Sequence, residues 1–159
     1  MKAIPNVLLA FLAVLPAVAS AQIPSCTILN SGVFRDVETY GSREAAVTPG
    51  GVEFLAHPRA SVEQTEHVPG RLGVMFGVVH RFEGIPAGGF IAAVIRHPPL
   101  SAKEGGTRTH SLLRKEPASS ATGFRFDRAE EIVPGEWTFE FQYQSHILCR
   151  KTFVVEKPL

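Results

Sequence analysis

The chain has 159 residues, of which 45% are hydrophobic and 19% are charged. This length predicts a single domain, and the apolar fraction is too high for a disordered polyelectrolyte. The 16 basic and 15 acidic residues leave a net charge of +1, which argues against bulk attraction to nucleic acid or anionic lipid. Two cysteines exclude a cysteine-dense scaffold, a four-cysteine zinc site and a cysteine-ligated iron–sulfur cluster.

The first segment, Met1–Ala21, has the three parts of a secretory signal peptide. Lys2 is the positive n-region, Val7–Leu15 is an uncharged apolar stretch, and Ala-Ser-Ala precedes a cleavage site. The alternative is a retained membrane anchor, but the apolar stretch is short for a span of about 20 residues. We therefore expect cleavage before Gln22, no stable membrane insertion afterwards, and a periplasmic or secreted single domain over Gln22–Leu159.

The rest of the chain predicts strands almost throughout, because apolar and polar residues alternate with a period of two. Early strands are expected at Ile28–Tyr40 and Gly51–Leu55, and a polar, edge-like strand at Ser61–His67. The most apolar strands are Leu72–Phe82 and Phe90–Arg96. Glycine and proline dominate the segment between these two, which predicts a hairpin with a long turn.

The C-terminal third shows the clearest alternation. Strands are expected at Thr107–Leu113 and Thr122–Phe126, followed by one helical turn at Arg128–Ile132. The aromatic residues of Trp137–Tyr143 share one face, and Ile147–Val155 follows after a short turn, so the pair predicts a terminal hairpin. In the second strand of this hairpin, one face is expected to carry Ile147, Cys149, Phe153 and Val155. Lys151 interrupts that face and is expected to lie toward an edge.

Roughly seven to nine short antiparallel strands predict an all-β fold, an antiparallel two-sheet immunoglobulin-like sandwich. A small β-barrel remains the alternative, because both folds combine alternating strands with Gly/Pro turns. Trp137 is the only tryptophan and is expected in the core, near the disulfide.

The two cysteines, Cys26 and Cys149, lie near the two ends of the expected mature chain. In an exported protein they predict one structural disulfide that fastens the first strand to the last. It would close a loop of roughly 120 residues, which the chain-entropy model values at about 4–5 kcal/mol.

No motif with catalytic or metal-binding chemistry stands out. The six histidines are His57, His67, His80, His97, His110 and His146, and none occurs as His-x-His or His-Glu-x-x-His. His80 shares the parity of apolar neighbours and is expected to be semi-buried. No Gly-x-Ser-x-Gly occurs, and Glu130 and Glu131 are expected to be solvated. We therefore expect no catalytic residues, no metal site and no cofactor.

A basic stretch at residues 96–116 is the candidate partner surface. It has only two acidic residues and no aromatic residue, which argues against binding of single-stranded nucleic acid. The candidate residues are Arg96, Lys103, Arg108, His110, Arg114 and Lys115.

Two stretches carry a resemblance to a known family. The first runs from Phe76-Gly77-Val78 to Pro98-Pro99-Leu100, and the second from Pro134-Gly135-Glu136-Trp137-Thr138-Phe139 to Lys151-Thr152-Phe153-Val154-Val155. In both, the chain resembles exported bacterial domains catalogued as a domain of unknown function. The resemblance implies a compact β-sandwich and an exported location, and it supplies no catalytic residues.

The function expected from these observations is a non-enzymatic module that binds an envelope or extracellular protein, or another envelope component. The candidate contact surfaces are the basic stretch and the polar Ser61–His67 edge. One alternative is an exported hydrolase or metal-dependent enzyme whose site is assembled from distant histidines. Another is a small-ligand carrier, which requires a hollow apolar interior.

Overall fold

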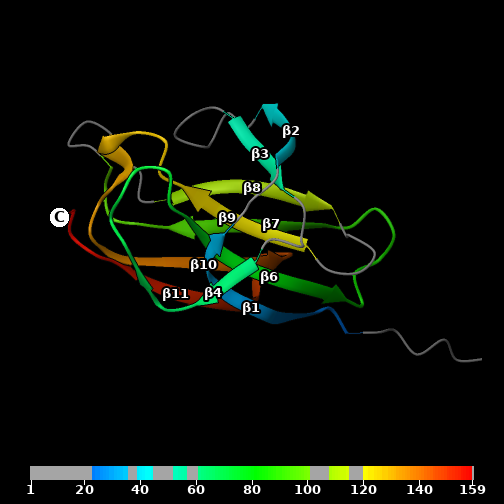
Figure 1. Cartoon of the computed structure of the whole chain (residues 1–159). Helices are drawn as coiled ribbons and strands as arrows, with labels where there is room; N and C mark the ends of the chain where they lie inside the picture. Colours follow the sequence, from blue (N-terminus) through cyan, green and yellow to red (C-terminus); the bar gives the residue numbers. More distant parts are fainter. Residues whose placement is uncertain are drawn as a thin grey trace, which may run out of the picture.

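The computed structural model describes residues 23–35, 39–44, 52–56, 61–100, 108–114 and 120–158, with the backbone alone for 39–44, 52–56 and 108–114. The described chain is all-β except for one short 3-10 helix, η1 (Figure 1). Its elements are β1 Ser25–Arg35, β2 Thr39–Glu44, β3 Val52–Ala56, β4 Ser61–Gln64, β5 His67–Val68, β6 Met75–Glu83, β7 Phe90–Arg96, β8 Arg108–Arg114, β9 Ser120–Arg125, η1 Ala129–Glu131, β10 Gly135–Tyr143 and β11 His146–Val155.

The strands form the predicted two-sheet sandwich. One sheet has the order β4-β1-β6-β9, and the other has the order β5-β11-β10-β7-β8. Each of these sheets ends in edge strands, so the described strands do not close into a barrel and the barrel alternative is wrong. Strands β2 and β3 pair with each other as a separate two-stranded sheet.

The two most apolar strands do not form the hairpin that the sequence predicts. Strand β6 lies inside the four-stranded sheet and β7 lies inside the five-stranded sheet, so residues 84–89 carry the chain between sheets. Gly84 and Gly88 have φ of 68° and 78°, and Gly89 donates a hydrogen bond to the Pro86 carbonyl at 2.9 Å. The same turn chemistry serves a hairpin and a sheet change, which is why composition alone predicted the wrong connection.

The long early strand expected at 28–40 is two strands. Strand β1 ends at Arg35, and Tyr40 belongs to β2, which pairs with β3. Within β1 the pairing with β6 shifts between Ile28 and Asn30, so Leu29 is an extra residue in a β-bulge. The edge position expected at 61–67 is confirmed, because β4 and β5 are outermost in their sheets, but the single strand expected there is two short strands in different sheets.

The terminal hairpin of β10 and β11 is confirmed, and its turn residues Gln144 and Ser145 both have positive φ. One detail is wrong. Ile147 is 48% exposed rather than core-facing, because the pairing shifts between Phe141 and Gln142 and leaves Leu148 as an extra residue. A bulge reverses the alternation of faces, so Ile147 lies on the opposite side from Phe153.

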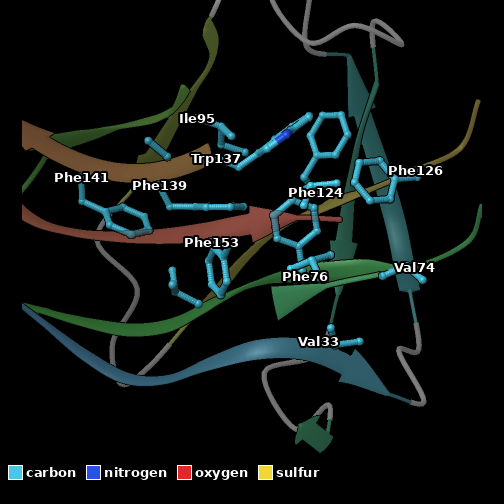
Figure 2. Packing of buried hydrophobic residues seen from close by; sticks show 14 of the residues in the cluster. Val33, Val74, Phe76, Ile95, Phe124, Phe126, Trp137, Phe139, Phe141 and Phe153 are labelled. Carbon is cyan, nitrogen blue, oxygen red and sulfur yellow. The ribbon is translucent and has the colours of Figure 1, made fainter. Parts of the chain in front are cut away.

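Aromatic side chains fill the space between the two main sheets (Figure 2). The ring of Phe76 lies 5.5–5.7 Å, centroid to centroid, from those of Phe126, Trp137, Phe139 and Phe153, several of them in edge-on contacts. Trp137 is fully buried, as expected, and donates its indole N–H to the Val133 carbonyl at 3.0 Å. The packed rings leave the described interior filled rather than hollow.

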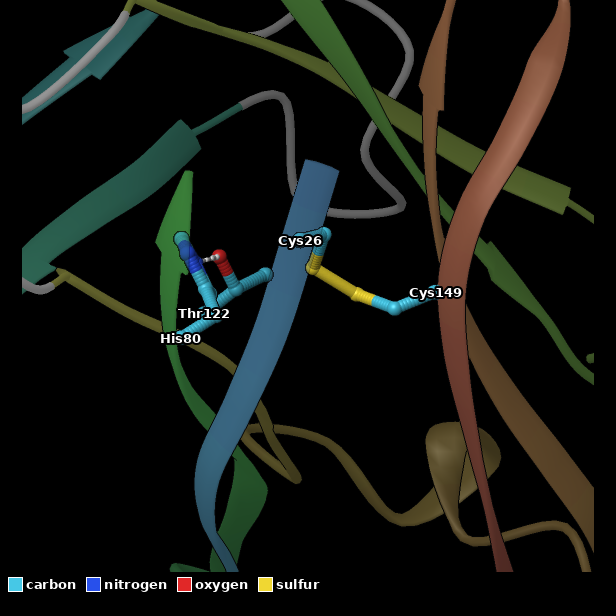
Figure 3. The surroundings of a disulfide bond; sticks show 4 residues. All are labelled: Cys26, His80, Thr122 and Cys149. Atoms are coloured by element: carbon cyan, nitrogen blue, oxygen red, sulfur yellow. Dashed lines mark hydrogen bonds between the residues drawn. A yellow bond between two sulfur atoms is a disulfide. The ribbon is translucent and has the colours of Figure 1, made fainter. Parts of the chain in front are cut away.

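Cys26 and Cys149 form the predicted disulfide, which joins β1 to β11 across the two sheets (Figure 3). Their Cα atoms are 5.6 Å apart. Trp137 does not lie beside this bond. Cys149 pairs with Phe141, and Trp137 is four residues away along β10, a separation of about 13 Å.

Candidate partner surface

The predicted basic residues fall on β7, on β8 and outside the described residues. Strand β8 is the outer strand of the five-stranded sheet and pairs with β7. The register places Arg108 opposite Arg96, His110 opposite Val94 and Arg114 opposite Phe90. Lys103 and Lys115 lie outside the described residues. The backbone therefore brings four of the six predicted positions onto two neighbouring strands.

Arg96 is the one predicted surface residue whose side chain is described, and it is engaged. Its Nε donates to Oε1 of Glu140 on β10 at 2.8 Å. The Glu140 side chain is only 6% exposed, and its other oxygen accepts from Gln142 Nε2 at 3.0 Å. No local sequence pattern predicts this contact, because Arg96 and Glu140 meet only through the pairing of β7 with β10.

Electrostatics around Glu140 keep the carboxylate ionised. Its hydrogen bond from Arg96 lowers its pKa below the usual value, although burial acts in the opposite direction. Arg150 lies opposite Glu140 on β11 and also lowers the pKa through its charge. The buried carboxylate thus interacts with two arginines, with Arg96 through a hydrogen bond and with Arg150 through charge. The even-numbered positions of β7 (90–96) and β8 (108–114) belong to the same face as Glu140, and four of them are basic. On this face Val94 is only 2% exposed, whereas the side chain of Arg96 is 40% exposed.

The second predicted surface, the 61–67 edge, contains a groove. Its volume is about 370 Å³, and it lies between β1, the β4–β5 crossing and β11. The groove is lined by Ile28, Leu29, Asn30, Ser31, Gln64, Thr65, Glu66 and Lys151. The lining is mostly polar, and no part of it comes from the basic stretch.

Lys151 closes one wall of this groove. Its Nζ contacts Oε1 of Glu66 at 2.5 Å, and that hydrogen bond lowers the pKa of Glu66. The Lys151 side chain is 25% exposed, as expected for a lysine on the core-facing side near an edge. Thr65 Oγ1 accepts from the His67 backbone N–H at 3.0 Å and so holds the turn between β4 and β5.

The described histidines lie in separate environments. His80 is fully buried, with its ring 4.6 Å from Phe82 and 4.4 Å from Phe141. His97 is also buried and stacks on Trp137 at 4.8 Å. His67 and His146 are exposed, and His57 lies outside the described residues. Among the described side chains, no group of three His, Cys, Asp or Glu residues is arranged to hold a metal ion.

His80 is more deeply buried than predicted, and one of its ring nitrogens is unsatisfied. Nε2 lies 2.9 Å from Thr122 Oγ1, whereas Nδ1 has no hydrogen-bond partner (Figure 3). The tautomer with the proton on Nε2 suits this site, because a bare lone pair costs less there than an orphaned N–H. Burial lowers the His80 pKa to about 4, so the ring is neutral near pH 7.

Glu131 is not the solvated residue that the sequence predicts. It is 4% exposed and accepts hydrogen bonds from the Asp127 backbone N–H at 2.9 Å and the Arg128 backbone N–H at 3.1 Å. Arg128 Nε adds a third at 3.0 Å. This carboxylate therefore organises the turn around η1, the predicted helical turn.

The sheet orders, the filled core and the disulfide define an immunoglobulin-like β-sandwich. Residues 22–155 match a family described as Domain of unknown function (DUF3859). The chain belongs to this family.

A solved structure supports the fold assignment. An immunoglobulin-like protein from Pseudomonas aeruginosa is 18% identical, with a TM-score of 0.65, over 87% of this chain and 100% of that chain. The search of curated proteins returned no match. No helix among the described residues is long and apolar enough to span a bilayer.

Proposed function

We propose that the chain is an exported, non-enzymatic immunoglobulin-like module that binds an acidic protein or another acidic envelope component through β7 and β8. The acidic partner contacts the face that carries Arg96, Arg108, His110 and Arg114. In this proposal the sandwich is a rigid support, and recognition depends on charge at its outer strand.

The observation that carries the proposal is the register of Arg108 opposite Arg96. Like charges placed directly opposite each other on neighbouring strands are destabilising. Glu140 compensates Arg96 only in part, because the same carboxylate also lies opposite Arg150. A carboxylate-rich partner over this face supplies the missing negative charge.

Two observations support export. The disulfide between Cys26 and Cys149 is typical of oxidising compartments such as the periplasm or the extracellular space. The family match begins at residue 22, where the mature chain is expected to begin after removal of Met1–Ala21.

The test measures binding of a fluorescein-labelled oligoglutamate peptide to the mature chain at low salt. The charge-reversal pair Arg108→Glu and Arg114→Glu should weaken binding about tenfold, since each exposed charge pair contributes up to about 1 kcal/mol. The matched control, Arg71→Glu with Arg81→Glu, reverses two exposed arginines outside β7 and β8 and should bind like the unaltered chain.

The same variants then serve as baits in an envelope extract, where the partner should be retained by the control and lost by the Arg108/Arg114 pair. Equal losses of binding in the Arg108/Arg114 pair and in the control pair would show that the partner responds only to the net charge of the chain. Unchanged binding in the Arg108/Arg114 pair would eliminate this surface.

A further inference from the structure

On one side of the sandwich, the outer strand of each main sheet is short and pairs with only part of its neighbour. Strand β4 pairs with β1 only from Gly32 to Arg35. Strand β5 pairs with β11 only at Val154 and Val155. Among the described strands, no other partner pairs with this edge of β1 before Gly32 or with this edge of β11 before Val154.

The polar groove begins where the β4 ladder stops. Its wall on β1 consists of residues 28–31, which are the four residues immediately before Gly32. Residues 64–66, where the chain leaves β4, form one end of the groove, and Lys151 of β11 forms the opposite wall. Within the part of the chain that the structure describes, the groove is therefore the unoccupied continuation of the position that β4 holds beside β1.

The groups around this position suit a peptide backbone. An unpaired strand edge offers backbone N–H and C=O groups that a further strand can pair with. Asn30, Ser31 and Gln64 add amide and hydroxyl groups around the same space. The Ser31 backbone N–H donates to Asn30 Oδ1 at 2.9 Å, so a bound main chain replaces this contact. We propose that the groove binds a short, extended peptide segment of a partner protein, which continues the β4 ladder along residues 28–31 of β1.

Three features limit the length and the side chains of this peptide. The bulge at Leu29 interrupts regular pairing, and the Cys26–Cys149 bond draws β1 and β11 to a Cα separation of 5.6 Å just beyond it. The ion pair of Lys151 with Glu66 neutralises the opposite wall. The peptide is therefore only a few residues long where it contacts β1, with small, neutral polar side chains, and its main chain supplies most of the recognition.

The test selects binders from a random heptapeptide library displayed on phage, with the full mature chain as bait. Selected peptides are synthesised, and their affinity is measured by fluorescence anisotropy. Gln64→Trp, at an exposed groove residue, fills the groove and should weaken binding at least about tenfold. Glu83→Trp, at an exposed position of β6 outside the groove, is the matched control and should bind normally.

Hydrogen exchange provides a readout that needs no variant. Bound peptide should slow exchange by about tenfold at those backbone amides of residues 28–31 that face the groove and not β6, and should leave β9 unchanged. The Arg108/Arg114 charge-reversal pair should bind these peptides normally, which separates this site from the acidic-partner surface.

Failure to select any peptide, or selection only of peptides that bind Gln64→Trp equally well, would overturn the proposal. So would concentration-dependent dimerisation that Gln64→Trp abolishes, since the occupant would then be a second copy of the chain.

Discussion

The two halves of the core are held together by different interactions. The aromatic half consists of Phe76, Phe124, Phe126, Trp137, Phe139 and Phe153, all within one hydrophobic cluster. The polar half contains His80 between Phe82 and Phe141, together with the Cys26–Cys149 bond. Within the polar half, the strand register places the disulfide beside the His80 cluster, because Cys26 pairs with Phe82 and Cys149 pairs with Phe141.

This difference predicts different sensitivities. Packing of apolar rings depends on shape and burial, which neither pH nor redox conditions alter directly. The polar half includes a buried imidazole, whose charge depends on pH, and a sulfur–sulfur bond, whose presence depends on redox conditions. The aromatic half therefore sets the baseline stability, and the polar half makes stability depend on the surroundings.

The largest effect is expected from Trp137→Ala in the aromatic half. Removing a fully buried indole leaves a cavity among closely packed rings and should lower the free energy of unfolding by about 4 kcal/mol. Urea denaturation followed by circular dichroism measures the loss at pH 7, where a loss below about 1 kcal/mol would show that this cluster is not the main support of the fold.

A smaller effect is expected from removal of the disulfide. The double variant Cys26→Ser with Cys149→Ser should lower the free energy of unfolding by about 3 kcal/mol, because the unfolded chain regains the freedom of a very long loop and measured losses usually fall below the chain-entropy value. Reducing the unaltered chain with dithiothreitol should have the same effect, whereas the serine variant should not respond to the reductant. A response of the serine variant would assign the effect to something other than the bond.

The smallest effect is expected from acidification. The folded His80 pKa of about 4 lies below the unfolded value near 6.5, so the unfolded chain takes up the proton first. The resulting stability is present above pH 6.5 and is lost as the pH falls toward 4, with a loss of about 2 kcal/mol between pH 7 and pH 5. Urea titrations across this range should show that slope in the unaltered chain and a much smaller one in His80→Phe. Equal slopes would mean that other groups cause the pH dependence.

Much of the fold could be predicted because alternation reports which side of a strand is buried. The alternation in 137–143 correctly placed Trp137, Phe139 and Phe141 in the core. The bulge at Leu148 could not be predicted, because one extra residue reverses every side chain beyond it without changing composition. The sheet change between β6 and β7 was missed because the turn residues do not encode which strand the chain pairs with next.

The candidate surfaces were predicted only in part. A local count of charges found the basic strand, but the ion pair of Arg96 with Glu140 links residues that are distant in sequence. The polar groove needs both the bulge at Leu29 and the crossing of the chain from β4 to β5. For the groove, the sequence signals were the polar edge at 61–67 and Lys151, a charge on an otherwise apolar face.

The bond between the first and the last strand also determines how the oxidised domain responds to mechanical pulling. Tension on the two ends of the chain passes through the residues before Cys26, across the sulfur atoms, and through the residues after Cys149. Everything between the two cysteines is bypassed by the force. Tension can therefore peel away only the part of β11 after Cys149, with its core residues Phe153 and Val155, together with the tail, whereas the strands between the two cysteines carry no load.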